Sequence, residues 1–164
     1  MSQFAEVWNF TRARLAEAIE GLSEEQLAWR LYPDAHNVFE LVYHVAGVEH
    51  YWATRLTGLN PSATEYEALL DLAVHGGFLR PGVGGPFRES KHLSARALNE
   101  TLDFTEARLK PVMENPTDAQ LQMVLSSPTG QEVVGHEALA QIAQHASYHT
   151  GQIWLASMSP KFPV

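Results

Sequence analysis

Apolar residues recur every three or four positions along four long segments of this sequence, and no other feature constrains the fold as strongly. The segments span roughly residues 4–20, 37–58, 91–114 and 136–158. A helix with this spacing has an apolar face, which another helix must cover. The pattern therefore predicts an all-α fold, a four-helix bundle that forms one domain over residues 1–164.

Capping and turn residues indicate where the first helices begin and end. Gly21 and Gly58 follow the first two long segments and are expected to end them, since glycine readily adopts the left-handed conformation of a C-cap. Asn37, with Glu40 three residues later, matches a capping box at the start of the second long helix. Ser23 is expected to start a short helix between the two.

The later connections are longer and more varied. A further helix is expected over residues 62–75. Residues Gly76–Ser90 hold five glycines and two prolines, so we expect a long loop here, either a plain surface crossover or a flap over a pocket. Pro111 is expected to kink or shorten the third long helix. Two short strands around Ser-Pro-Thr-Gly, within residues 121–135, predict a small β-hairpin before the last helix.

The composition excludes several classes of function. The chain has no cysteine, which excludes disulfides, thiolate metal sites and a nucleophilic cysteine. Its formal net charge is −8 and its 11 lysines and arginines are scattered, so neither nucleic acid nor a membrane is expected as a partner. No apolar run approaches the roughly 20 residues that span a bilayer, and no signal peptide is recognisable. A cytoplasmic location is therefore expected.

Two histidines on the last helix are candidate metal ligands. His145 and His149 stand four residues apart, so both rings lie on one face of the helix, and Ile142 and Ala146 place that face beside the apolar one. Buried neutral imidazoles need partners, because burying an unpaired polar group is costly. A metal ion would satisfy both rings, and so would hydrogen bonds in an ordinary core pair. The spacing alone leaves both interpretations open.

A third ligand is predicted on the second long helix. His44 shares an apolar stripe with Leu41 and Val48, so its ring should also point inward. With His44 included, a metal site becomes the favoured interpretation. The other histidines are not expected to be ligands: His50 should lie at a boundary or on the surface, His36 in a loop, His75 and His92 on exposed flanks of the glycine-rich segment, and His136 at a helix start.

The stretches NVFELVYHVAGVEHYW and HEALAQIAQHASYHTGQIW resemble the DinB/YfiT-like superfamily of damage-inducible four-helix-bundle proteins. The resemblance extends over essentially the whole chain. It implies a divalent metal ion held by His44, His145 and His149, and it implies a homodimer. Two positions depart from the pattern of many relatives, because Gln141 stands where they have histidine and Thr150 where they have arginine. These departures bear on the substrate contacts.

Three imidazole ligands would leave coordination positions open, which is the arrangement of a catalytic metal site. Nitrogen ligands suit zinc, nickel or ferrous iron. The resemblance implies an S-transferase or isomerase that uses a low-molecular-weight thiol, such as bacillithiol or mycothiol, with an electrophilic small-molecule substrate. Because the chain has no cysteine, the thiolate would have to come with this cosubstrate.

Two other functions remain open from the residues alone, so the sequence does not decide whether the protein is an enzyme. A metal-dependent hydrolase would need a general base, and Glu40, one turn before His44, is the nearby carboxylate. A non-catalytic metal- or small-molecule-binding module in a stress response needs no such group. Tyr51 lies close to the face of His44 and is a weak candidate for orienting a substrate, although a core aromatic is commoner at such a position.

Overall fold

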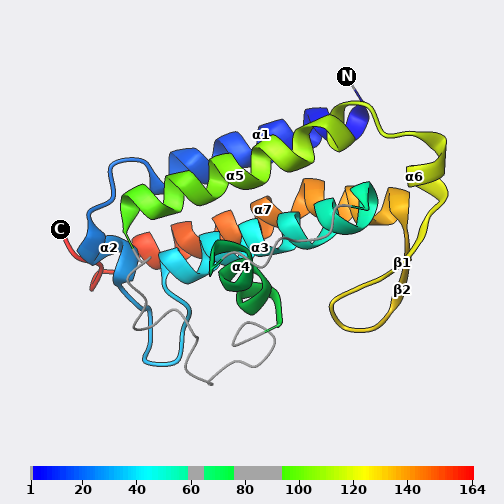
Figure 1. Ribbon diagram of the computed structural model, residues 1–164. Coiled ribbons are helices and arrows are strands. Elements are labelled where there is room, and N and C mark those ends of the chain that lie inside the picture. The colour runs from blue at the N-terminus through cyan, green and yellow to red at the C-terminus, as the bar shows by residue number, and fades with distance from the viewer. Residues whose placement is uncertain (1, 59–64, 76–93) are drawn as a thin grey trace.

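Four long helices form a bundle, as the apolar spacing predicts (Figure 1). The computed structural model describes residues 2–58, 65–75 and 94–164. Its long helices are α1 (Gln3–Ile19), α3 (Val38–Thr57), α5 (Ala95–Glu114) and α7 (Gly135–Ser157). Helix α1 packs along α7, and α3 packs against both α5 and α7, while α1 and α5 touch more sparsely. The predicted all-α class is confirmed.

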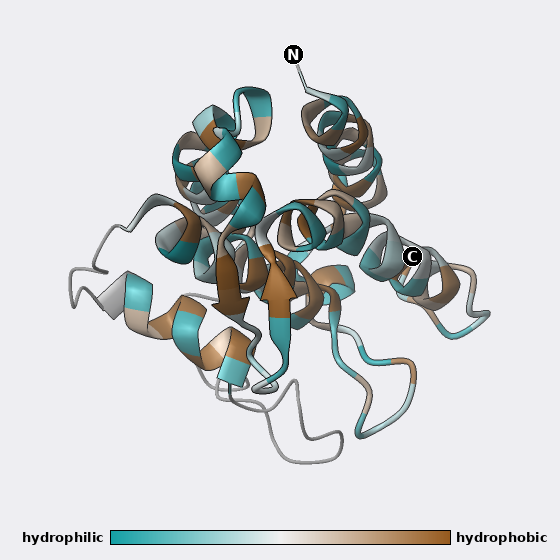
Figure 2. Cartoon of the chain, turned by 90° about the vertical axis from the view of Figure 1, so that its right-hand side faces the viewer, coloured by the Kyte–Doolittle hydropathy of each residue, from teal (hydrophilic) through white to brown (hydrophobic). Residues whose placement is uncertain are grey.

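Short elements connect the long helices. They are α2 (Glu24–Ala28), α4 (Glu65–His75), α6 (Asp118–Gln122), β1 (Val124–Ser126) and β2 (Glu132–Val134). The two strands pair antiparallel, which confirms the predicted hairpin, and Leu125 lies opposite Val133. Figure 2 shows the hairpin with its apolar strands at the near end of the bundle. Helix α6 was not predicted, because five residues are too few to show a helical period.

Helices α3 and α5 run in the same direction, opposite to α1 and α7 (Figure 1). The chain must therefore cross back along the bundle between them, and α4 lies in this crossover, packed on the outside of α3. The predicted helix over residues 62–75 is confirmed in its C-terminal part. The loop or flap predicted for Gly76–Ser90 and the position of His92 lie outside the described residues.

The predicted caps are present. The Asn37 side chain accepts a hydrogen bond from the Glu40 N–H at 2.9 Å, and the Glu40 carboxylate accepts one from the Asn37 N–H at 3.0 Å. This reciprocal pair satisfies two donors that would otherwise be unbonded at the start of α3. Gly58 ends the same helix in the left-handed conformation, with φ of +68°. Ser23 forms the corresponding box with Gln26 at the start of α2.

Pro111 is expected to kink or shorten the third helix; the shortening is wrong, because α5 continues to Glu114, and the kink stays a prediction. A proline costs one intrahelical hydrogen bond and crowds the preceding turn. This cost is tolerated close to the end of the helix, where the Asn115 N–H still donates to the Pro111 carbonyl at 3.1 Å.

The placement of His50 at a boundary or on the surface is also wrong, because its side chain is only 3% exposed. The helical spacing correctly places His50 on a different face of α3 from His44. That face is not exposed to solvent, however, because other helices cover it. Helices α4 and α5 cover the face opposite α7, and the His50 ring lies 5.9 Å from that of Phe104 on α5.

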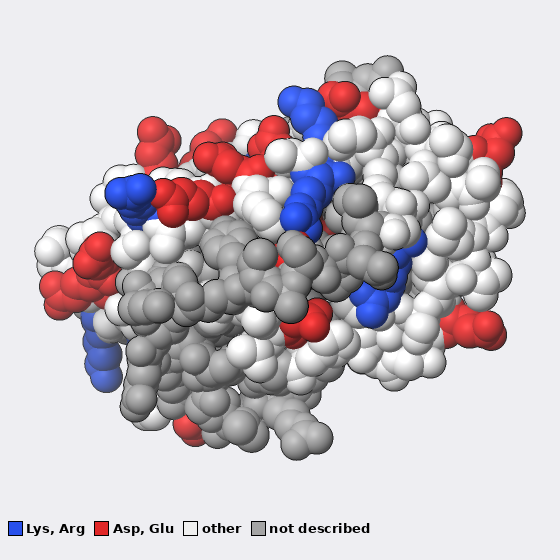
Figure 3. Space-filling model, viewed as in Figure 1, with Lys and Arg blue, Asp and Glu red and all other residues white. Residues whose placement is uncertain are grey.

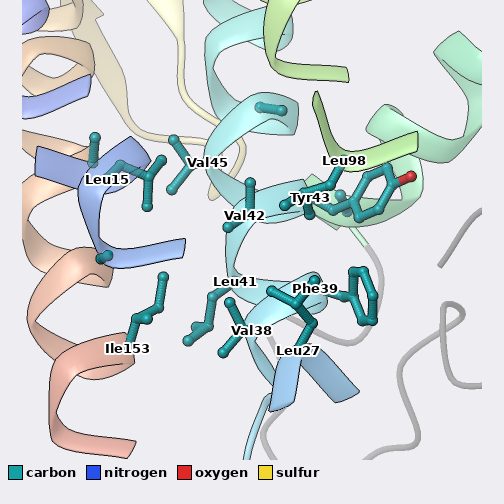
Figure 4. Packing of buried hydrophobic residues seen from close by; sticks show 14 of the residues in the cluster. Leu15, Leu27, Val38, Phe39, Leu41, Val42, Tyr43, Val45, Leu98 and Ile153 are labelled. Atoms are coloured by element: carbon teal, nitrogen blue, oxygen red, sulfur yellow. The ribbon is translucent and has the colours of Figure 1, made fainter. Parts of the chain in front are cut away.

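Two apolar clusters bind the helices together. Figure 4 shows Leu41, Val42 and Val45 of α3 packed toward Leu15 of α1 and Ile153 of α7. A second cluster continues along the bundle and is centred on two fully buried tryptophans, one from α1 and one from α3. Because each cluster draws on all four long helices, we expect the bundle to fold without a ligand.

The surface agrees with the acidic composition. On the face seen in Figure 3, acidic side chains are scattered over the surface and along its outline, and basic ones lie at a few separate places. Among the described residues, no helix combines the length and the apolar character that crossing a membrane would require. The exclusion of nucleic acid as a partner stays a prediction.

Gly47 allows α4 to lie directly on α3. A Cβ atom at this position would stand 2.7 Å from the Leu70 carbonyl oxygen and 3.0 Å from the Ala73 Cβ. The close approach brings the last turn of α4 over α3, where the Ala73 carbonyl meets the ring of His44. The position of the His44 ring thus depends on the absence of a side chain at Gly47, about one turn further along α3.

We expect Gly47→Ala to destabilise the fold by about 1–3 kcal/mol, the usual cost of inserting an atom into a packed interior. The better helix propensity of alanine, up to about 1 kcal/mol, offsets this only in part. Urea unfolding of the metal-free protein measures the change.

Gly151→Ala is the matched control, because Gly151 lies in α7 with no atom within 4 Å of the added Cβ. This variant should be as stable as the wild type or more so. Equal stability of both variants would show that α4 is not held against Gly47.

Candidate metal centre

Three histidine rings from two facing helices meet in the bundle. His44 comes from α3, and His145 and His149 come from α7. One ring nitrogen from each lies within 4.8 Å of the others. The ring centroids are 4.5–4.9 Å apart, and the planes are steeply inclined to one another. The structure therefore brings together the three residues that the sequence singles out.

Hydrogen bonds fix which nitrogen of two rings carries a proton. The Nδ1 of His44 lies 3.1 Å from the Ala73 carbonyl oxygen, and the Nδ1 of His149 lies 2.7 Å from Oε1 of Gln152. Since oxygen can only accept here, each Nδ1 donates. A neutral ring that donates from Nδ1 has a lone pair on Nε2. Such an outer hydrogen bond is typical of histidines that bind metals, because it fixes the tautomer and the ring orientation.

The pair on α7 has too few partners by itself. Nε2 of His149 lies 3.1 Å from Nε2 of His145, and Nδ1 of His145 is buried without a hydrogen bond. If His145 donates from Nε2 to His149, its buried Nδ1 keeps a bare lone pair, which is costly. A cation bound to both Nε2 atoms would use both of their lone pairs and replace the contact between the two rings, while the His145 proton would then lie on its buried Nδ1. The 3.1 Å separation is close to the roughly 3.3 Å edge of a tetrahedral site with metal–nitrogen bonds of about 2.0–2.1 Å.

Burial keeps all three rings neutral. Removal from water lowers the pKa of His44 to about 4, helped by the nearby His149 and opposed by the bond to Ala73. Burial likewise lowers the pKa of His145 to about 2 and that of His149 to about 4. At neutral pH the lone pairs are therefore available without the release of a proton, as binding of a divalent cation requires. The residues present fit such an ion.

The three rings lie at the wall of a cavity of about 480 Å³. Its lining residues are His36, Leu41, His44, Gln144, His145, Tyr148, His149 and Gln152. The sequence did not single out His36, Gln144, Tyr148 or Gln152 as site residues. Gln152 could have been found, because it stands three residues after His149 and so lies beside it on the helix.

Tyr51 lies away from the three rings. Its hydroxyl donates to the Ser126 carbonyl in the hairpin at 2.6 Å, and the Arg55 guanidinium stacks 3.3 Å above its ring centroid. Tyr51 is not among the described residues that line the histidine cavity. Its role in orienting a substrate stays a prediction.

Glu40 is engaged in structural contacts on all sides. Its two oxygens each lie 2.6 Å from an Arg30 nitrogen, and one is 3.4 Å from Nδ1 of His36. Burial alone would raise the pKa of this carboxyl, but the bonds from His36, Arg30 and the Asn37 backbone outweigh burial and lower it to about 2. A carboxylate held this firmly in its charged form is a weak base.

The remaining histidines take no part in the triad. His75 ends α4 and is exposed, as predicted, and its ring lies 5.6 Å from that of Tyr51. His136 lies exposed in the first turn of α7, as predicted. Thr150 stands where many relatives have arginine. It is buried, and its hydroxyl donates to the Ala146 carbonyl at 2.7 Å. Gln141, the other such position, is exposed.

Comparisons with known proteins agree with this architecture. The family model described as the DinB superfamily matches residues 8–153. No curated protein matches the sequence. A solved structure described as a conserved protein from Enterococcus faecalis superimposes with a TM-score of 0.68 at 17% identity, covering 93% of this chain and 92% of the other. At that identity the likeness concerns the fold alone.

The lowered pKa values predict a pH dependence of stability for the metal-free protein. Below pH 6.5 the unfolded chain binds protons at these histidines, while the folded chain does not until about pH 4 or lower. Stability should therefore fall as the pH decreases from 7 to 5, by up to about 2 kcal/mol at pH 5 for a ring such as His145. Urea unfolding at a series of pH values measures this loss.

His145→Asn should lose correspondingly less stability over the same range, because it lacks one of the titrating rings. His136→Asn is the control, since this ring is exposed. An equal pH dependence in the wild type and His145→Asn would contradict the burial of a neutral ring.

Proposed function

The chain belongs to the DinB superfamily, and on this premise we propose that it binds one divalent metal ion through His44, His145 and His149. We further propose that it is a metal-dependent S-transferase that joins a low-molecular-weight thiol to an electrophilic small molecule. Zinc, nickel and ferrous iron all accept imidazole ligands and are the candidate ions. A cytoplasmic location and a homodimer belong to the same proposal and rest on the sequence and the family resemblance.

One observation carries the proposal most directly, namely that three neutral rings converge at the wall of an open cavity. Three protein ligands leave room for a small molecule at the ion, as in catalytic rather than structural sites. A bound metal ion supplies the power to deprotonate a coordinated thiol.

The chain itself holds and orients the ligands. The Ala73 carbonyl fixes the ring of His44, and Gln152 fixes that of His149. Leu41 is buried, and Tyr148 packs edge-on at 5.0 Å against His149, so both limit the access of water to the rings. With no cysteine in the chain, the sulfur nucleophile comes from the cosubstrate.

A hydrolytic reaction is less well supported. It needs a base beside a metal-bound water. Glu40, the carboxylate proposed for this role, is bound at both oxygens by Arg30, and its pKa is lowered to about 2. No carboxylate, Glu40 included, is among the described residues that line the cavity. Thiol transfer would not require a strong protein base, because a metal ion held by the three histidines would lower the pKa of the thiol.

The second candidate function is a non-catalytic module that binds a metal ion or a small molecule, for example in a stress response. The same lack of a carboxylate among the described cavity residues favours it, since binding alone needs no acid or base. Turnover separates the two candidates.

Protein purified without a histidine tag should contain about one divalent ion per chain, and His149→Ala should lose it together with thiol-dependent turnover. Metal analysis measures the first, and a panel of cellular thiols with a chromogenic electrophile measures the second. Circular dichroism should show unchanged helical content.

His136→Ala serves as the control and should keep both the ion and the activity, because His136 lies in the exposed first turn of α7. If the metal-loaded protein turns over no thiol faster than the free metal does, the transferase proposal is wrong and the non-catalytic binding module takes its place. Full metal content in His149→Ala would refute the site itself.

Removing the ion with a chelator should lower the melting temperature while the bundle stays folded. The apolar clusters hold the four helices without help, and a ligand at a hundred times its Kd adds only about 2.7 kcal/mol. Thermal unfolding followed by circular dichroism, with and without saturating metal, gives the shift. Either complete unfolding on mild chelation or a melting temperature that metal leaves unchanged would disagree with this expectation.

A further inference from the structure

A second cavity shares part of its lining with the one that holds the histidines. Its volume is about 180 Å³, and it is lined by Leu31, Tyr32, Ala35, His36, Leu41, Gln152, Leu155 and Ala156. His36, Leu41 and Gln152 also line the histidine cavity, so the two spaces share a wall of three residues. We name the smaller space the side cavity. The side cavity therefore lies next to the histidine cavity, within reach of a ligand that extends past these three residues.

The walls of the side cavity expose apolar groups to solvent. Leu31 is 39% exposed, Tyr32 is 60% exposed and Leu155 is 61% exposed. Together with Tyr148, which is 63% exposed beside the histidines, these side chains surround the openings of the two cavities. Large apolar groups that gather around a concave site are typical of small-molecule binding, whereas single exposed ones need no explanation.

The junction between the cavities is polar and is held in place. Oε1 of Gln152 accepts the His149 proton at 2.7 Å, so the Gln152 amide nitrogen is the end of that side chain left to contact a ligand. His36 is held from the other side, with Nδ1 3.4 Å from the Glu40 carboxylate. No lysine or arginine is among the described residues that line either cavity, so an anionic ligand would find no charged partner there.

From these observations we propose that the side cavity binds the tail of the thiol that reaches the histidines, and that this tail is neutral, apolar and about the size of a phenyl group. The proposal rests on the proposed function, because it takes the histidines as the place where sulfur binds. The size follows from the volume: an apolar cavity of about 150 Å³ accepts benzene, so about 180 Å³ suffices for a phenyl group. The absence of cationic side chains from the described walls selects against a carboxylated tail.

The test uses the protein loaded with Co²⁺, whose thiolate complexes give a charge-transfer absorption band that reports sulfur binding directly. Two probes are titrated, 2-mercaptoethanol and 2-phenylethanethiol, which present the same head with a polar or an apolar tail. We expect 2-phenylethanethiol to bind at least about tenfold more tightly, as burial of part of a phenyl group predicts.

Leu155→Ser should reduce this preference to within about threefold while leaving the Kd of 2-mercaptoethanol unchanged. Phe10→Ser is the matched control, because Phe10 is similarly exposed at 66% but lies on α1 and lines neither cavity. It should keep the full preference. Equal affinities of the two thiols for the wild type, or an undiminished preference in Leu155→Ser, would overturn the side cavity as the tail site and leave the metal centre standing.

A different result would concern the proposed function. If neither thiol produces the absorption band, sulfur does not bind at the histidines. The side cavity is then tested on the metal-free protein with 2-phenylethanol, which has the same tail and no sulfur. Shifts of the Leu31 and Leu155 methyl signals in NMR spectra would support an apolar-tail site, and their absence would overturn it.

Discussion

The burial of α3 on nearly every side is the constraint on which the rest of the structure depends. Seventeen of its 20 residues are buried, because α2, α4, α5 and α7 all pack against it. A helix in this position leaves little water for its polar side chains, so a buried polar group without an internal partner is costly, and among the described residues only a few, such as His50 Nδ1, are left so. Glu49 shows the result: its carboxylate accepts hydrogen bonds from Trp8 of α1 at 2.9 Å and Thr105 of α5 at 2.8 Å, with Arg12 at 3.5 Å. The buried charge thereby links three helices.

The same environment gives opposite results for Glu40 and His44, which lie one turn apart on α3. Burial disfavours the charged form of both. Glu40 nevertheless stays ionised, because Arg30 supplies a positive charge at both oxygens. His44 lies beside the Ala73 carbonyl and two other histidine rings, and its pKa is lowered, so it stays neutral and keeps a lone pair. The partners, and not the depth of burial, decide which side chain serves structure and which can bind a ligand.

Much of this arrangement can be predicted from the sequence, because its signals are local. Helical spacing places His44 on an inward face, and Asn37 with Glu40 marks where α3 starts. What the sequence misses depends on how many neighbours surround a helix. Spacing gives the direction of His50 relative to His44, but it cannot say that α4 and α5 cover that direction as well. The side cavity is missed for a similar reason, since Leu31 and Leu155 meet only when the segment before α3 folds against the end of α7.

The triad joins parts of the chain that are far apart in sequence. His145 and His149 are near neighbours on one helix, but His44 lies about a hundred residues away, and closing a loop of that length carries an entropic cost. The unfolded chain can offer an ion the α7 pair at most, and the third ring arrives only after α3 and α7 have docked. An ion that needs all three rings could therefore bind only after α3 and α7 have docked, and it would stabilise the folded bundle relative to the unfolded chain. A metal ion at this centre would thus link α3 and α7 directly, across a stretch of chain about a hundred residues long.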